Sequence, residues 1–174
     1  MELIFETHRL IVRKFEMTDI RQLYVNHLEK EVKDWIPNES YADMEETRGA
    51  VEFYMDCVDQ RHLPFVLAVE SKETGELIGD TGINEVDGSP NEVEIGYSIA
   101  QKYSGNGYAT ELVNQMSEFV HERLGVNRLY GRVMHGNRAS ERVLEKNGFS
   151  FITEKFGAED DPYGKGMRIY RKDY

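Results

Sequence analysis

The sequence predicts an α/β fold, with one mixed sheet of about seven strands and helices on both of its faces. Short segments with alternating or continuous apolar residues indicate strands, and longer segments with apolar residues three or four positions apart indicate helices. The two kinds of segment follow one another in the order β-α-α-β-β-β-α-β-α-β-β. The 174 residues are enough to enclose one substantial core, so a single domain over residues 1–174 is expected.

These patterns give the expected elements in chain order. Strands are expected over residues 9–15, 65–70, 77–83, 92–99, 128–133, 151–155 and 167–170. Helices are expected from Thr18, as N-cap, to about residue 29, then over about 43–58 behind a Ser40–Asp43 capping pair, over 109–124 and over 138–146. Residues 33–39, which contain the only tryptophan, are expected to form a loop.

The composition limits the classes of function. A formal net charge of -11 disfavours binding to nucleic acid or anionic lipid and favours a cationic partner. No apolar run reaches the roughly 20 residues of a membrane span, and the acidic N-terminus does not resemble a secretory signal, so a cytoplasmic location is expected. The histidines and the single cysteine, Cys57, show no metal-ligand spacing, and no metal is expected. The chain is expected to be a monomer or a homodimer.

The most informative stretch runs from the strand at residues 92–99 into the helix that begins near Ala109. Between them, Gly105, Gly107 and Ala109 occupy alternate positions of a turn. Small residues there leave backbone N–H groups unobstructed at a helix N-terminus, where these groups lack partners. A strand, a small-residue turn and a helix start form a cradle for an anion, and the expected anion is a phosphate.

Two common phosphate-binding loops do not match this turn. A P-loop requires Lys and then Ser or Thr after its second glycine, where this chain has Tyr108 and Ala109. A dinucleotide fingerprint requires a small residue at position 110, which is Thr, and an acid at the end of the next strand. That strand, over residues 128–133, ends without an acid.

The segment Ser104-Gly105-Asn106-Gly107-Tyr108-Ala109 resembles instead the acyl-coenzyme A signature Gln/Arg-x-x-Gly-x-Gly/Ala of the GNAT superfamily of N-acetyltransferases, with Ser104 in place of Gln or Arg. Further segments extend the resemblance over nearly the whole chain, to the branch of ribosomal-protein N-terminal acetyltransferases and spermidine acetyltransferases. They are Glu6-Thr7-His8-Arg9-Leu10, Gly75-Glu76-Leu77-Ile78-Gly79, Val93-Glu94-Ile95-Gly96-Tyr97, Ala109-Thr110-Glu111, Asn137-Arg138-Ala139-Ser140 and Glu145-Lys146-Asn147-Gly148-Phe149. This resemblance implies a mostly antiparallel sheet and the transfer of an acetyl group from acetyl-CoA to a primary amine by direct attack.

The resemblance also implies where acetyl-CoA binds. The backbone of Tyr97, Ser98 and Ile99 is expected to bind the pantetheine arm, in a splay between the central strand and the next one. The pyrophosphate is expected on Ser104, Gly105, Asn106, Gly107, Tyr108, Ala109 and Thr110. Asn137 matches a family asparagine whose amide reaches the cofactor arm, and it is equally suited to cap the helix that follows.

A carboxylate is the expected base, because an alkyl amine with a pKa of about 10.4 is mostly protonated at neutral pH. Strand alternation places Glu94 beside the edge where the cofactor is expected, and Glu92 on the same face one pair further away. Both are also ordinary solvent-facing strand positions. His135, late on the strand across the splay, is an alternative base.

Many family members use a tyrosine in the short helix after the asparagine to protonate the leaving thiolate, and this position is Leu144 here. The ribosomal-protein branch has a serine three residues after the asparagine, and Ser140 matches it. Ser140 is therefore expected to donate a hydrogen bond to the sulfur, relaying a proton from water. The missing tyrosine leaves open a different class of protein, a non-catalytic acyl-CoA sensor.

The acceptor is expected to be selected by residues 19–58 together with Glu92. Trp35, Asp34 and Glu39 offer an aromatic wall and negative charge to a cation. The acids of the following helix suit its N-terminal dipole and need no substrate; they are Asp43, Glu45 and Glu46. The sequence does not distinguish the N-terminal α-amine of a protein from a small amine or polyamine.

Overall fold

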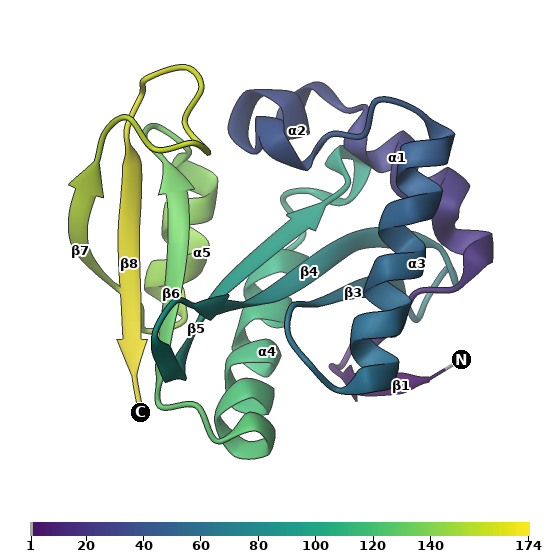
Figure 1. Ribbon diagram of the computed structural model, residues 1–174, viewed down its shortest axis with the longest axis horizontal. Helices are drawn as coiled ribbons and strands as arrows, with labels where there is room; N and C mark the ends of the chain where they lie inside the picture. The colour runs from purple at the N-terminus through teal and green to yellow at the C-terminus, as the bar shows by residue number, and fades with distance from the viewer. Residues whose placement is uncertain (1) are drawn as a thin grey trace.

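The computed structural model describes residues 2–174, which form an eight-stranded sheet in the order β1-β2-β3-β4-β5-β6-β8-β7 (Figure 1). The strands are β1 (Leu3–Glu6), β2 (Leu10–Arg13), β3 (Phe65–Ser71), β4 (Leu77–Val86), β5 (Ser89–Ile99), β6 (Arg128–Met134), β7 (Ser150–Lys155) and β8 (Met167–Asp173). All neighbours are antiparallel except β5 and β6, which are parallel. The predicted α/β fold with a mostly antiparallel sheet is confirmed, with one strand more than expected.

The additional strand is β1, which pairs with β2 through Phe5↔Val12 and Glu6↔Ile11. The Phe5 ring lies 5.1 Å from the Phe119 ring of the helix beneath. The backbone N–H of Thr7 donates to the Leu10 carbonyl and closes the tight turn between the strands. A strand of four residues is too short to show an alternating pattern, so the sequence does not reveal it.

Five α-helices accompany the sheet: α1 (Ile20–His27), α2 (Lys30–Trp35), α3 (Met44–Gln60), α4 (Tyr108–Leu124) and α5 (Arg138–Lys146). Helices α1 and α3 cover one face, where Leu23 and Val51 pack with Ala68 of β3 (Figure 1). Helices α4 and α5 cover the opposite face, where Leu112 and Leu144 join the larger core. No helix within residues 2–174 is long and apolar enough to cross a membrane.

Three local expectations are wrong. The expected loop at residues 33–39 is helical, because α2 ends at Trp35 and Pro37–Glu39 forms a 3-10 turn. Thr18 is not an N-cap; it lies inside a 3-10 turn that Asp19 closes by accepting the Glu16 N–H at 2.7 Å. Asp43, rather than a Ser40–Asp43 pair, caps α3, since its Oδ1 accepts the N–H groups of Glu45 and Glu46.

The sheet opens between its two central strands. Strands β5 and β6 pair only from Glu92↔Arg128 to Ile95↔Gly131. Beyond this point β5 stays with β4 as far as Ile99, while β6 stays with β8 as far as Met134. The edge of β5 over residues 96–99 therefore faces an opening, with no strand of the described chain paired to it (Figure 1).

Candidate active site

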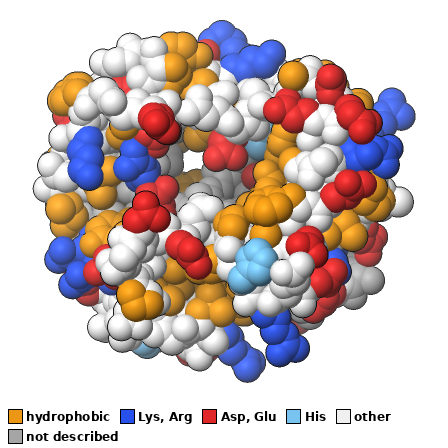
Figure 2. Space-filling model, viewed as in Figure 1, with side chains coloured by type: hydrophobic (Ala, Val, Ile, Leu, Met, Phe, Trp, Pro, Cys, Tyr) orange, Lys and Arg blue, Asp and Glu red, His pale blue; other side chains and the backbone are white. Residues whose placement is uncertain are grey.

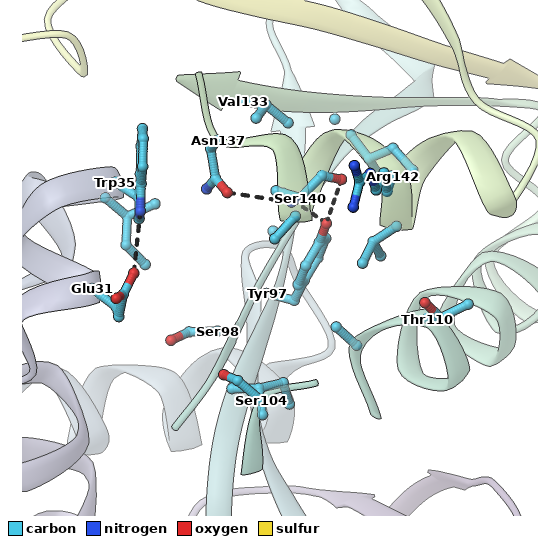
Figure 3. A pocket seen from close by; sticks show the side chains of 18 of the residues that line it. Glu31, Trp35, Tyr97, Ser98, Ser104, Thr110, Val133, Asn137, Ser140 and Arg142 are labelled. Carbon is cyan, nitrogen blue, oxygen red and sulfur yellow. Dashed lines mark hydrogen bonds between the residues drawn. The ribbon is translucent and has the colours of Figure 1, made fainter. Parts of the chain in front are cut away.

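The opening between β5 and β6 is part of a cleft of about 760 Å³, which is within the usual size range of ligand sites. Its walls are β5, the turn before α4, the first residues of α5, β6 and α2 (Figure 3). Three of the expected cofactor-binding residues, Tyr97, Ser98 and Ile99, line it from β5.

The turn before α4 forms the far end of the cleft. Gly105 and Gly107 have φ angles of +78° and +80°, a conformation that favours glycine. No side chain caps α4, and among the described residues no acceptor takes a hydrogen bond from the backbone N–H groups between Ser104 and Glu111. The Glu111 N–H is the first to bond, to the Gly107 carbonyl. The small-residue turn thus presents a row of free donors, as an anion cradle requires.

Arg9 supports this cradle from behind, a role that the sequence pattern did not suggest. Its Nη1 donates to the Asn106 carbonyl at 2.9 Å, and its Nε donates to Glu111 at 2.7 Å. The guanidinium carbon lies 4.2 Å from the centre of the Tyr108 ring. The only advance signal was that Arg9 belongs to one of the segments that resemble the family.

Asn137 and Ser140 lie together at the start of α5. The Asn137 Oδ1 accepts the Ser140 N–H at 3.3 Å, so Asn137 does cap this helix. Both side chains line the cleft (Figure 3). The Ser140 hydroxyl lies 2.8 Å from the phenol oxygen of Tyr97, a contact that the sequence analysis missed. Leu144, at the position of the absent tyrosine, is buried; a Cβ added to Gly131 would lie 2.7 Å from its Cδ1.

Glu94 occupies the last part of β5 before the opening, opposite Asn84 of β4 and beside Tyr130 of β6. Desolvation raises its pKa; Arg132, 3.8 Å away, opposes this, and the charges of Asp160 and Glu39 add to it. Arg132 itself bonds both oxygens of Asp160, at 2.9 and 2.7 Å. Glu94 is therefore a carboxylate with an elevated pKa and only a weak ion pair, as a proton acceptor requires.

The two alternative bases are held by other groups. Arg128 bonds Glu92 at 2.7 Å. His135 is 51% exposed, and its Nδ1 lies 2.5 Å from Glu154 of β7.

Trp35 closes one side of the cleft from α2, and its Nε1 donates to Glu31 at 3.2 Å (Figure 3). The Lys165 Nζ of the β7–β8 loop lies over the Trp35 ring, 4.9 Å from its centre. Two hydrogen bonds of 2.9 Å join the same segments, from Tyr163 to the Lys33 carbonyl and from Asn38 to the Glu159 carbonyl. Asp34 does not line the cleft, and its carboxylate pairs with Lys30.

A second group of acids lies on the α1–α3 face of the sheet, the face that also carries Glu94. The Nε2 of buried His27 lies 2.6 Å from the Asp80 carboxylate, and its Nδ1 lies 2.5 Å from the Glu39 carbonyl oxygen. Glu39 is accessible to solvent, yet desolvation of its carboxyl and the charge of Asp80 raise its pKa, against the effect of His27. Figure 2 shows a hollow near the centre of the viewed face with Asp and Glu side chains around it.

A sheet that opens beside a donor-rich cradle, with a carboxylate and a hydroxyl near the opening, defines a class of protein that binds an acyl-coenzyme A and acts on an amine. Comparison with known proteins agrees. Residues 9–150 match the family model described as acetyltransferase (GNAT) domain, and the chain belongs to this family.

A relative supports this assignment, and two solved structures share the fold. The chain is 30% identical to an uncharacterized N-acetyltransferase of Bacillus licheniformis, p20, over 88% of this chain and 84% of that protein. A GNAT-family acetyltransferase from Bacillus anthracis superposes with a TM-score of 0.84 at 22% identity, covering 99% of this chain and 98% of the other. RimL, a ribosomal L7/L12 alpha-N-protein acetyltransferase in complex with coenzyme A, superposes with a TM-score of 0.82 at 20% identity, covering 99% and 98%. At these identities the structural matches demonstrate a shared fold.

The chain is thus an acetyl-CoA-dependent N-acetyltransferase, which transfers an acetyl group from acetyl-CoA to an amine. The alternative of a non-catalytic acyl-CoA sensor is not favoured.

Proposed function

We propose that this enzyme acetylates a primary amine by direct attack, with acetyl-CoA bound in the opening between β5 and β6. The observation that carries the proposal is the unpaired β5 edge over residues 96–99, which leads to the free donors between Ser104 and Glu111. An extended arm fits the first feature and a pyrophosphate fits the second. Acetyl-CoA supplies the acetyl group as a thioester, and Asn137 adds an amide beside the arm.

Glu94 accepts the proton of the attacking amine in this proposal. Its elevated pKa brings its basicity closer to that of the amine, and its pairing with Arg132 is too long to fix its oxygens. Ser140 lies across the opening on α5 and donates to the sulfur that leaves. Glu92 and His135, which are held by Arg128 and Glu154, support these steps less well.

The acceptor is a cationic amine. Glu39 makes no ion pair with a described Lys or Arg, and it lies close enough to Glu94 for its charge to contribute to the raised pKa of Glu94. Trp35 adds an aromatic wall, and an amine cation is attracted both to carboxylates and to an aromatic face. RimL acts on a protein α-amine, so a protein N-terminus is one candidate. A small amine or polyamine is the other, because the same carboxylates attract it equally well.

A screen of amine acceptors at saturating acetyl-CoA tests the proposal, with release of free thiol as the signal. Peptides with free and blocked N-termini, diamines, polyamines and lysine derivatives make up the panel. Acetylation of at least one primary amine is expected. The proposal would be contradicted if no amine raised thiol release above the rate of hydrolysis measured without an acceptor.

Cofactor binding is tested separately with Gly107→Glu. A glutamate there adds bulk and negative charge to a position with φ +80° in the cradle, so calorimetric binding of acetyl-CoA should be lost. Gly88→Glu is the matched control, since Gly88 has φ +74° in the β4–β5 turn, away from the cradle. Normal binding by a folded Gly107→Glu protein would remove the cradle from the proposal.

Three further expectations belong to this proposal. They are one N-acetyltransferase domain over residues 1–174, a cytoplasmic location, and a monomer or homodimer that binds neither nucleic acid nor membrane. Limited proteolysis, cell fractionation and sedimentation test them in turn.

A further inference from the structure

The phenol of Tyr97 reaches across the opening of the sheet to α5. Its oxygen lies 2.8 Å from the Ser140 Oγ, and it donates to the Ser140 carbonyl oxygen at 3.3 Å (Figure 3). Both residues line the cleft. A side chain of the strand expected to bind the cofactor is thereby tied to the residue expected beside the sulfur.

Two arrangements of hydrogens are compatible with these distances. In the first, Ser140 donates to Tyr97, and Tyr97 donates to the Ser140 carbonyl. In the second, Tyr97 donates to the Ser140 Oγ, and the hydroxyl hydrogen of Ser140 is free to point into the cleft. A hydroxyl is both donor and acceptor and can rotate, so the pair can pass from one arrangement to the other without moving a heavy atom.

We propose that Tyr97 is a positioning residue that donates to the Ser140 Oγ as the thiolate forms, and so directs the hydroxyl hydrogen of Ser140 towards the sulfur. This inference rests on the proposed function, which places Ser140 beside the thioester. In the reaction, the amine nitrogen bonds to the acetyl carbon, and the carbon–sulfur bond breaks with its electron pair going to sulfur. Glu94 takes the proton that converts the ammonium group into the free amine. The nitrogen loses a second proton as the amide forms, and the sulfur takes a proton through Ser140 from a water. The hydroxide left by that water accepts the second nitrogen proton, so atoms and charge balance.

The surroundings of Tyr97 suit this task. Burial raises the pKa of Tyr97 to about 12, against a lowering by the Ser140 hydrogen bond, so the phenol keeps its proton at any working pH. The other tyrosines on the cleft are engaged elsewhere: Tyr103 donates to Glu76, and the Tyr108 ring lies against Arg9. Leu144 has no hydrogen to donate. Tyr97 is thus the phenol that can support Ser140 in this chain.

The test compares Tyr97→Phe, Ser140→Ala and the double variant with wild type. Tyr97→Phe should lower kcat about tenfold while the KM for acetyl-CoA stays within about twofold, because only the reacting state uses the donated hydrogen. The double variant should be no slower than Ser140→Ala, since Tyr97 acts through Ser140. Tyr174→Phe is the matched control: it removes a phenol that donates to Glu118 at 2.8 Å, outside the cleft.

A second readout does not depend on turnover. The pKa of the coenzyme A thiol when bound, obtained from the pH dependence of its binding, should rise by about one unit in Tyr97→Phe and in Ser140→Ala. Desulfo-coenzyme A, which has no thiol, should bind all variants equally. If Tyr97→Phe does not fold, a ring-fluorinated tyrosine at position 97 keeps the shape and is a stronger donor, so the bound thiol pKa should fall below that of wild type.

Losses that add in the double variant, or an unchanged thiol pKa, would overturn the proposal. So would an effect of Tyr97→Phe confined to melting temperature and KM, which would make the contact a structural link between β5 and α5. Failure of the proposed function would look different, because wild type itself would then bind no coenzyme A or acetylate no amine.

Discussion

At the scale of single residues, the charge state of Glu94 decides whether the proposed chemistry can start. Glu94→Gln keeps the shape and removes the basicity, so kcat/KM should fall about 10²–10⁴-fold at neutral pH with cofactor affinity little changed. The loss should shrink at high pH, where the free amine is already present. Initial rates from pH 6 to 10 measure this.

With an acceptor amine of lower pKa, Glu94→Gln should lower kcat/KM by a smaller factor. Glu92→Gln, whose wild-type carboxylate is held by Arg128, tests the neighbouring position on the same face. An equal loss in Glu92→Gln, or full activity of Glu94→Gln at neutral pH, would assign the base elsewhere. A loss that is the same at every pH would instead make Glu94 a residue that positions the substrate.

His27 couples stability to pH. Burial disfavours its charge, but the Asp80 carboxylate and the Glu39 carbonyl outweigh this and raise the pKa of His27 from 6.5 to about 9. Below the unfolded pKa the histidine is protonated in both states and its contribution is complete. That contribution, about 3 kcal/mol, is lost as the pH rises from the unfolded to the folded pKa.

The free energy of unfolding of His27→Gln should therefore fall short of wild type by more at pH 6 than at pH 9.5. Urea unfolding at both pH values gives the difference, and variation of other groups cancels between the two proteins. His62→Gln, at an exposed histidine, is the control. A difference independent of pH would mean that His27 is not charged in the folded protein.

At the scale of elements, close contact between β4 and β5 positions the strand whose open edge we propose binds the cofactor. A Cβ on Gly79 would lie 2.1 Å from the backbone oxygen of Ser98, so β5 must shift. Gly79→Ala should destabilise the protein by about 1–3 kcal/mol and raise the KM for acetyl-CoA. Thermal unfolding and steady-state kinetics measure both effects.

Gly82→Ala on the same strand is the matched control, because its Cβ would make an ordinary 3.5 Å contact with Asn84. Equal effects of the two substitutions would show that β4 tolerates no side chain at either position and that the contact with Ser98 is not the cause.

Long, periodic elements were the predictable part of this molecule. The apolar spacing of α4 and the alternation of β5 predict both elements and place Glu94 on the face opposite Ile95, as the structure also has it. Helix α2 has only six residues, too few for a repeat, and forms because buried Val32 and the contacts of Trp35 hold it. The sequence alone therefore predicts the sheet and the small-residue turn before α4, and not helix α2.

Contacts between distant segments could not be predicted. His27 and Asp80 lie 53 positions apart, and Tyr97 and Ser140 lie 43 positions apart. Both pairs depend on the exact distance between a helix and the sheet, which residue patterns do not encode. Family resemblance predicts a role for Ser140 in the reaction and none for the side chain of Tyr97.

At the scale of the whole molecule, the net charge of -11 should attract a cationic acceptor over long range. For such an acceptor, kcat/KM should fall about fivefold as ionic strength rises from about 20 to about 300 mM, because salt screens these charges. kcat should change little. Rates with an aromatic amine, which is neutral at pH 7.5, provide the comparison, and an equal salt effect on both amines would exclude steering by charge.

The opening in the sheet also has a consequence for the lifetime of the protein. If acetyl-CoA lies along residues 96–99 of β5, then the ligand forms the hydrogen bonds that this edge of the sheet otherwise lacks. Those hydrogen bonds are lost when the product leaves and form again when the next acetyl-CoA binds. A ligand at 100 times its Kd adds about 2.7 kcal/mol to the free energy of unfolding. Amides of β5 and β6 beside the opening should then exchange with solvent more slowly, and proteases should degrade the chain more slowly, when acyl-CoA is abundant. The supply of its own substrate would set how long this enzyme persists.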